Sequence, residues 1–213
     1  GGFGRCHQRP VPTYTLHRMS PDGSNIRMIS YHETNEWNPA VDNNGMIIYT
    51  RWDYVDRGAT HMHSAWITNP AGEDARALVL NYPIPQRHMS NVGHLRDVPL
   101  MQMSMRPIPN SNKIVATAAP HHGQFYGTLI VIDPDVEDDD HTSTFVHITP
   151  STGGFPESGG GSTNYATPYP LREELFLTVY SPDSGEITKY GIYLLNVKDG
   201  KEGDTISSGR KGN

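Results

Sequence analysis

The sequence predicts an all-β protein built as a β-propeller, with about three and a half four-stranded blades in the chain. The first observation is composition: 35% of the residues are hydrophobic, and 21 Gly, 17 Pro and 11 Tyr favour strands and turns over long helices. The second is a strand order that recurs three times along the chain. The third is that two residue markers repeat at a common spacing. With 213 residues, one domain is the simplest arrangement.

The elements follow one order in each copy: a Pro-containing strand, a turn, an apolar strand, a loop, another apolar strand, a turn and a short last strand. A partial copy comes first, "YTLHRMSPDGSNIRMIS", in which the turn Pro21-Asp22-Gly23 joins two strands. The first complete copy is "NPAVDNNGMIIYTRW" with "HSAWITNPAGEDARALV". The second is "RPIPNSNKIVATAA" with "GTLIVIDPDVED" and "FVHIT", and the third is "TPYPLREELFLTVYS" with "YGIYLLNVKDGK".

Two kinds of marker recur about every 60 to 70 residues, and agreement between two independent markers indicates a repeat. They are the leading prolines and the turn-entry residues: Pro39, Pro107 and Pro168, and Asn69, Asp133 and Asn196. A β-sandwich is the alternative, but it gives no reason for one four-strand order to repeat. We therefore predict a single propeller domain over 1–213, with blades at 10–30 (partial), 36–80, 104–149 and 165–206. Closed propellers have about four to eight blades, so the chain is expected to be part of a larger ring.

Charge and cysteine content exclude several classes of protein. The formal net charge is -6, from 17 Lys and Arg against 23 Asp and Glu, and it argues against nucleic-acid binding. Cys6 is the only cysteine, which excludes an internal disulfide and a four-cysteine zinc site. No window approaches the roughly 18 apolar residues of a membrane span, and no signal-peptide pattern is present. We expect a soluble piece of a longer protein.

Several segments together resemble one family. They are "RMSPDGSNIRMIS", "NEWNPAV", "GMIIYTRWDYVDR", "RPIPNSNKIVAT", "HHG" and "LIVIDP". They are similar to the middle propeller domain of hydrazine-synthase alpha-subunit-like proteins, and the first segment also resembles the wider TolB/PD40-like propeller repeat. The resemblance covers 3–150, and 165–198 by strand pattern alone.

The resemblance implies a periplasmic or secreted protein in which this propeller precedes a cytochrome-c-like domain. The chain contains no Cys-x-x-Cys-His motif, so a c-type haem is expected only in a neighbouring domain or subunit. The implied role is that of a non-catalytic or accessory domain, a scaffold for a haem or cofactor domain or for partner subunits of one assembly. If the chain contributes to catalysis, the family implies an oxidoreductase component of the hydrazine-synthase type. No nucleophile elbow, P-loop or dinucleotide fingerprint is present.

The strand "YTRWDYVDR" concentrates charged and aromatic residues. Alternation along a strand places Tyr49, Arg51 and Asp53 on one face, and Thr50, Trp52 and Tyr54 on the other. One interpretation is inter-blade ion pairing and aromatic packing; the other is a ligand site at the mouth of a funnel. The candidate set is Arg51, Trp52, Asp53, Tyr54, Arg57 and Arg106.

Histidines and the single thiol form a second candidate set, for a bound transition metal. Its members are Cys6, His7, His61, His63, His121 and His122. Imidazole and thiolate ligate zinc, copper and iron, but such a site must be assembled here from distant loops. This alternative predicts a metal- or haem-associated redox component. The other interpretation is that the loop histidines are solvated and that Cys6 is an inert core residue.

The segment "DPDVEDDDH" carries alternating carboxylates that resemble a calcium loop: Asp133, Asp135, Glu137 and Asp139. It lacks the central Gly and the terminal Glu of an EF-hand, so a solvated turn between strands is the other interpretation.

Two long polar insertions support a third functional alternative. They lie at 81–103 and 150–165, and long loops of this kind are commonly functional or mobile. They predict a TolB-like protein-binding propeller whose loops grip a peptide or another envelope protein.

Overall fold

All described residues of the protein lie in strands, turns and connecting segments. The computed structural model describes residues 3–6, 9–32, 35–52, 63–80, 99, 101–120, 126–136, 144–149, 164–181, 190–197 and 205–207, of which 3–6, 9–11 and 205–207 are described as strand backbone only. Within these ranges there are sixteen strands and no helix, and hence no helix that could cross a membrane. The all-β prediction is confirmed.

The strands fall into groups that follow the chain. Two hairpins come first: β1 (Phe3–Cys6) with β2 (Arg9–Pro12), and β3 (His17–Arg18) with β4 (Arg27–Met28). Next come β5 (Asn35–Val41), β6 (Ile47–Trp52), β7 (His63–Thr68) and β8 (Arg76–Ala77). They are followed by β9 (Met101–Pro107), β10 (Ile114–Ala119), β11 (Thr128–Ile132) and β12 (Phe145–His147). The last group is β13 (Tyr165–Arg172), β14 (Leu175–Tyr180), β15 (Gly191–Asn196) and β16 (Thr205–Ser207).

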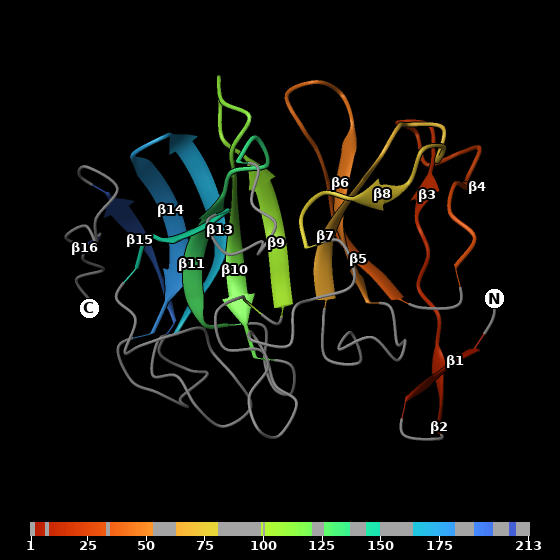
Figure 1. Ribbon diagram of the computed structural model, residues 1–213, viewed down its shortest axis with the longest axis horizontal. Coiled ribbons are helices and arrows are strands. Elements are labelled where there is room, and N and C mark those ends of the chain that lie inside the picture. Colours follow the sequence, from red (N-terminus) through yellow and green to blue (C-terminus); the bar gives the residue numbers. More distant parts are fainter. Residues whose placement is uncertain are drawn as a thin grey trace.

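Each group of four is an antiparallel meander in chain order, and a single parallel pairing of His63 with Met101 joins β7 to β9, so that β5–β12 belong to one eight-stranded sheet. We call β5–β8 the first unit, β9–β12 the second, β13–β16 the third, and β3–β4 the partial unit. The units succeed one another across Figure 1, from the partial unit on one side to β15 and β16 on the other. The leading strand β9 contacts both β5 and β13. This is the strand order of propeller blades, but the described strands do not close a ring, so the propeller itself stays a prediction.

Hydrophobic clusters lie between successive units, because the sheets bury both faces. In β10, Ile114, Ala116 and Ala118 belong to a cluster shared with Ile48 and Ile67 of the first unit. Their neighbour Val115 belongs to a second cluster, which contains Tyr165, Phe176 and Leu195 of the third unit. A strand buried on both faces shows a continuous apolar run instead of alternation, as "IVATAA" does. A smaller cluster of Leu16, Ile29 and Tyr49 joins the partial unit to the first unit.

The leading strand of every complete unit contains a bulge at an equivalent point. Asn38, Ser104 and Thr167 have φ of 50°, 53° and 49°, and the pairing with the second strand shifts at each of these places. Positive φ in a residue other than Gly costs of order 1 kcal/mol and persists only where the surrounding fold imposes it. Three bulges in register therefore indicate one structural requirement shared by the units.

The bulges correct the proline alignment made from sequence. Pro39 and Pro168 directly follow the positive-φ residues Asn38 and Thr167, whereas Met105 follows Ser104. Pro107 pairs with Ile114, the place that Val41 takes opposite Ile47. Pro107 therefore corresponds to Val41 and not to Pro39. Proline is tolerated at both places, because the hydrogen-bond pairing between the strands is interrupted at the first and ends at the second. The presence of a proline therefore did not reveal that Pro39 and Pro107 are two residues out of alignment.

Gly72 marks a close approach between the partial unit and the first unit. It lies in the turn after β7, with φ of 84° and its N–H bonded to the Asn69 carbonyl. A Cβ at this position would lie 1.7 Å from the Ile29 carbonyl oxygen. Any side chain here would push the two units apart, so glycine is required by space as well as by φ.

Candidate functional site

Arg51 and Trp52 point to opposite sides of β6, as strand alternation predicts. Arg51 donates from Nη1 to Nε2 of His32 over 2.8 Å, and its guanidinium carbon lies 3.8 Å from the centre of the Trp66 ring. Since a guanidinium can only donate, His32 accepts at Nε2 and carries its proton on Nδ1. Asp53, Tyr54 and Arg57 lie outside the described residues. The described part of this cluster joins the first unit to the segment that follows β4.

Trp52 belongs to a stack of three rings on the other side of the first unit. Its centroid lies 4.9 Å from that of His63 and 6.3 Å from that of Trp37, with interplanar angles of 16° and 18°. Trp37 in turn packs against a cluster formed by Met101, Met103 and Ala119 of the second unit. Trp52 and His63 are buried, Trp37 is half-buried, and the stack joins two units, so its geometry is that of packing between sheets.

Most of the proposed metal ligands lie outside the described residues. His63 is the one member with a described side chain, and it lies 5% exposed within the ring stack. Cys6 is described as strand backbone only, and His7, His61, His121 and His122 lie outside the described residues. Within the residues that the structure describes, no three His, Cys, Asp or Glu side chains gather as metal ligands.

The described half of the proposed calcium loop forms turns and side-chain bonds. The Asp133 carboxylate accepts from the Asp135 N–H over 3.2 Å, and the Asp135 carboxylate accepts from the Asn112 amide over 2.8 Å. Glu137 and Asp139 lie outside the described residues, so the calcium prediction remains untested as a set.

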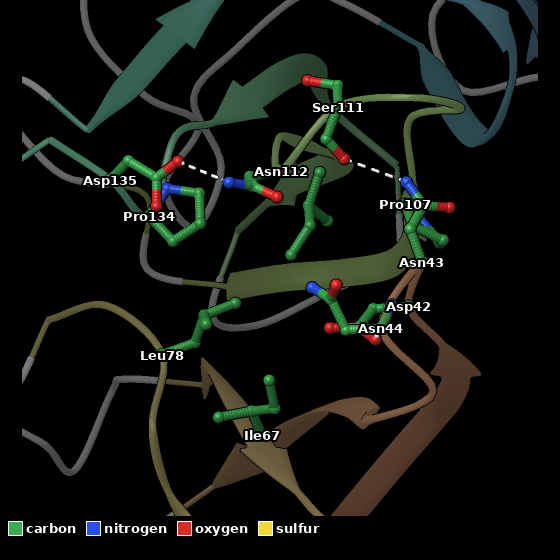
Figure 2. A pocket seen from close by; sticks show the side chains of 11 residues that line it. Asp42, Asn43, Asn44, Ile67, Leu78, Pro107, Ser111, Asn112, Pro134 and Asp135 are labelled. Carbon is green, nitrogen blue, oxygen red and sulfur yellow. Dashed lines mark hydrogen bonds between the residues drawn. The ribbon is translucent and has the colours of Figure 1, made fainter.

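Asp135 also lines a pocket of about 220 Å³ between the turns of the first and second units. Figure 2 shows Asn43, Ser111, Asn112 and Asp135 around it, with Ile67 and Leu78 on the opposite side. The Asn43 amide donates to the carbonyls of Ile108 and Ser111, over 2.7 Å and 2.9 Å. The Asn43 and Asn112 side-chain amides thus bond within the protein. The bonds of Asn43 tie two turns together.

A second hollow, of about 360 Å³, lies where the leading strands of all three complete units meet. We call it the leading-strand cleft. Each strand contributes a proline to its wall: Pro39 from β5, Pro107 from β9 and Pro170 from β13. Arg106 and Tyr169 are its polar lining residues, and Tyr169 is 57% exposed. This cleft is the best candidate functional site in the described structure, because ligand sites form in hollows with mainly apolar walls and few polar groups.

The bulge in β9 decides where Arg106 points. Arg106 pairs across the sheet with Val115, which belongs to the cluster shared with the third unit, so Arg106 lies on the face toward that unit. Its neighbour Met105 belongs to the cluster shared with the first unit. The Arg106 Nη1 donates to the Met105 carbonyl over 2.8 Å. Arg106 was a sequence candidate; Tyr169 and the prolines were missed, because only the fold brings three strands so distant in the chain to one place.

The sequence interpretation also missed a threonine that recurs in two units. Thr50 and Thr117 are each the fourth residue of the second strand, and each pairs with the residue just before the bulge, Trp37 or Met103. Thr50 donates to the Gln102 carbonyl of the next unit over 2.5 Å, and Thr117 accepts from the Thr167 N–H of the next unit over 3.2 Å. In the third unit Val179 takes this place, opposite Ala166. The signal was present in "IIYTRW" and "IVATAA".

Comparison with known proteins supports the fold. A solved structure of Kuenenia stuttgartiensis hydrazine synthase matches with a TM-score of 0.60 and 18% sequence identity, over 92% of this chain and 22% of that chain. The chain shares the fold of a part of that protein. At this identity the likeness concerns fold alone, and the chain spans less than a quarter of the length of its structural neighbour. No protein-family model matches the sequence, and no curated protein matches it.

Proposed function

We propose that this chain is a non-catalytic β-propeller domain of a periplasmic or secreted, hydrazine-synthase-alpha-like protein, in which it is a scaffold for a haem or cofactor domain or for partner subunits. The observation that carries the proposal is that buried polar groups form hydrogen bonds between units. Gln102 of the second unit accepts from the buried Ala65 N–H through its side chain and from Thr50 through its carbonyl. Bonds of this kind tie each unit to the next, as a rigid support requires.

The partial unit offers a surface on which such a scaffold could hold a neighbour. It has two strands, whereas each complete unit has four. Large apolar side chains in and beside it are exposed: Tyr14, Met19, Ile26, Met28 and Tyr31. Concentrations of exposed apolar residues mark interaction surfaces, and an edge strand can pair with further strands. The expected neighbour is another domain or subunit of the same assembly.

The test is made on the natural protein purified together with its bound partners. Replacing Met19, Met28 and Tyr31 together by Ser removes most of the apolar contact area, so the haem-bearing polypeptide is expected to separate on gel filtration. Haem absorbance across the eluted fractions measures this. Circular dichroism should be unchanged, because these side chains are exposed.

The matched control carries Val136→Ser and Val146→Ser, which change exposed apolar residues of the second unit instead. It should keep its haem partner. The scaffold role is wrong if the triple variant retains the partner to the same extent as the control. It is also wrong if the isolated 213-residue chain catalyses redox turnover by itself.

A further inference from the structure

The leading-strand cleft contains a cation whose charge no described acidic group balances. Arg106 is the only charged one among the described residues that line it. Its one described hydrogen bond runs to the carbonyl of its own neighbour, Met105. Among the described residues, no carboxylate forms an ion pair with Arg106. A guanidinium has five N–H donors in a planar fork, so most of this capacity is available to an anion.

The walls of the cleft indicate what the uncharged part of such an anion should be. Pro39, Pro107 and Pro170 present rigid apolar rings, and Tyr169 adds an exposed aromatic face. The volume of about 360 Å³ lies near the lower end of the roughly 300–1,000 Å³ of small-molecule sites. One cation among apolar walls suits a molecule with one negative charge and an apolar body, and it suits a multiply charged phosphate less well.

We propose that the leading-strand cleft binds a small organic monocarboxylate, whose carboxylate pairs with Arg106 and whose apolar body lies against Tyr169 and the prolines. The guanidinium fork matches the two carboxylate oxygens. The site is preorganised, because its wall residues belong to strands whose bulges at Asn38, Ser104 and Thr167 are fixed by pairing within each unit. This inference is independent of the scaffold proposal, which concerns the partial unit.

The experiment titrates the 213-residue chain with benzoate and follows amide NMR signals. Binding is expected with a dissociation constant of order millimolar, as befits one charged contact and a small apolar area. Benzamide has the same shape without the charge and is expected to bind at least about tenfold more weakly. Added salt should weaken benzoate binding, since a half-buried pair is still partly screened.

Variants locate the binding. Arg106→Gln should reduce benzoate affinity about tenfold or more, and Arg106→Lys should give an intermediate loss because it retains charge without the fork. Arg27→Gln is the control: Arg27 is an exposed arginine on β4, away from the cleft, and its loss should change nothing. Thermal unfolding of each variant verifies its fold, and the benzamide comparison needs no variant at all.

Four results would overturn the inference. They are equal binding of benzoate to Arg106→Gln and the parent chain, binding of benzamide as tight as that of benzoate, no signal shift at millimolar benzoate, and tighter binding of inorganic phosphate than of benzoate. None of these results bears on partner retention, so the scaffold proposal and this one can fail separately.

Discussion

The junction between the first and second units and the junction between the second and third share a common frame and differ in the side chains added to it. At both, a threonine in the fourth position of the second strand forms a hydrogen bond with the next unit. Both also contain an apolar cluster and a short backbone pairing, of His63 with Met101 at the first junction and of Gly127 with Tyr165 at the second. To these the first junction adds the Trp37, Trp52 and His63 ring stack and the amide of Gln102, whereas the cluster of the second contains the Phe176 ring.

The difference shows which part of a repeat is constrained. Blade order and the threonine bond recur because every unit must present the same edge to the next. The remaining contacts need only fill the space between two sheets, and aromatic stacking and aliphatic packing both achieve this. The junctions should therefore respond alike to loss of the shared threonine and differently to loss of their own side chains.

The largest effect is expected from Phe176→Ala. Phe176 is fully buried in the cluster shared by the second and third units, so truncation leaves a cavity and should lower the free energy of unfolding by about 3–5 kcal/mol. Urea denaturation measures the change. The control Ile192→Ala, at a residue 65% exposed in the same unit, should cost under about 1 kcal/mol. Equal losses in the two variants would show that the cluster does not hold these units together.

An intermediate and equal effect is expected from Thr50→Val and Thr117→Val. Each substitution keeps the shape of the side chain and removes one hydrogen bond between units, worth about 1 kcal/mol in the free energy of unfolding. Urea denaturation of the two single variants should agree within about 0.5 kcal/mol. A loss at one position with no change at the other would mean that the repeated threonine is not a shared device.

The smallest effect is expected at the ion pair of Lys113 with Glu173, which links the second and third units at the surface. The hydrogen bond to Glu173 raises the pKa of Lys113 above its usual 10.5. The stabilisation is therefore fully present below pH 10.5 and is lost as the pH rises through the raised value.

Because the Lys113 side chain is 38% exposed, Lys113→Gln should cost under about 1 kcal/mol near neutral pH. Urea denaturation of this variant and the parent chain, repeated above pH 10.5, should show the two converging. A difference that grows with pH would contradict the assignment of this pair.

The sequence predicted most of the local structure correctly. The turn at Asp42–Gly45 closes with the Gly45 N–H bonded to the Asp42 carbonyl, and Gly23 closes the turn of the partial unit in the same way. Such turns are predictable because glycine alone adopts their positive φ without strain. The alternation that separates Arg51 from Trp52 was also predictable, because a strand places successive side chains on opposite faces.

The register of the leading strands was not predictable from proline positions. Both strands carry the bulge, but Pro39 lies within it whereas Pro107 lies two residues further along, at the end of the ladder, and proline is tolerated at either place. Nor could alternation show where Arg106 points. The bulge changes the parity of β9 between Met103 and Arg106, so the face of each residue depends on pairing with β10.

By itself the sequence determined that the chain is all-β, that one four-strand order repeats, and where the turns fall, since these depend on neighbours a few residues apart. The tertiary structure decided which side chains meet between units. It brought Pro39, Arg106 and Tyr169 to one cleft from three distant strands, and it bonded Thr50 to Gln102. Contacts between units depend on bulges, sheet stacking and close approaches such as that of Gly72 to Ile29, which no local pattern encodes.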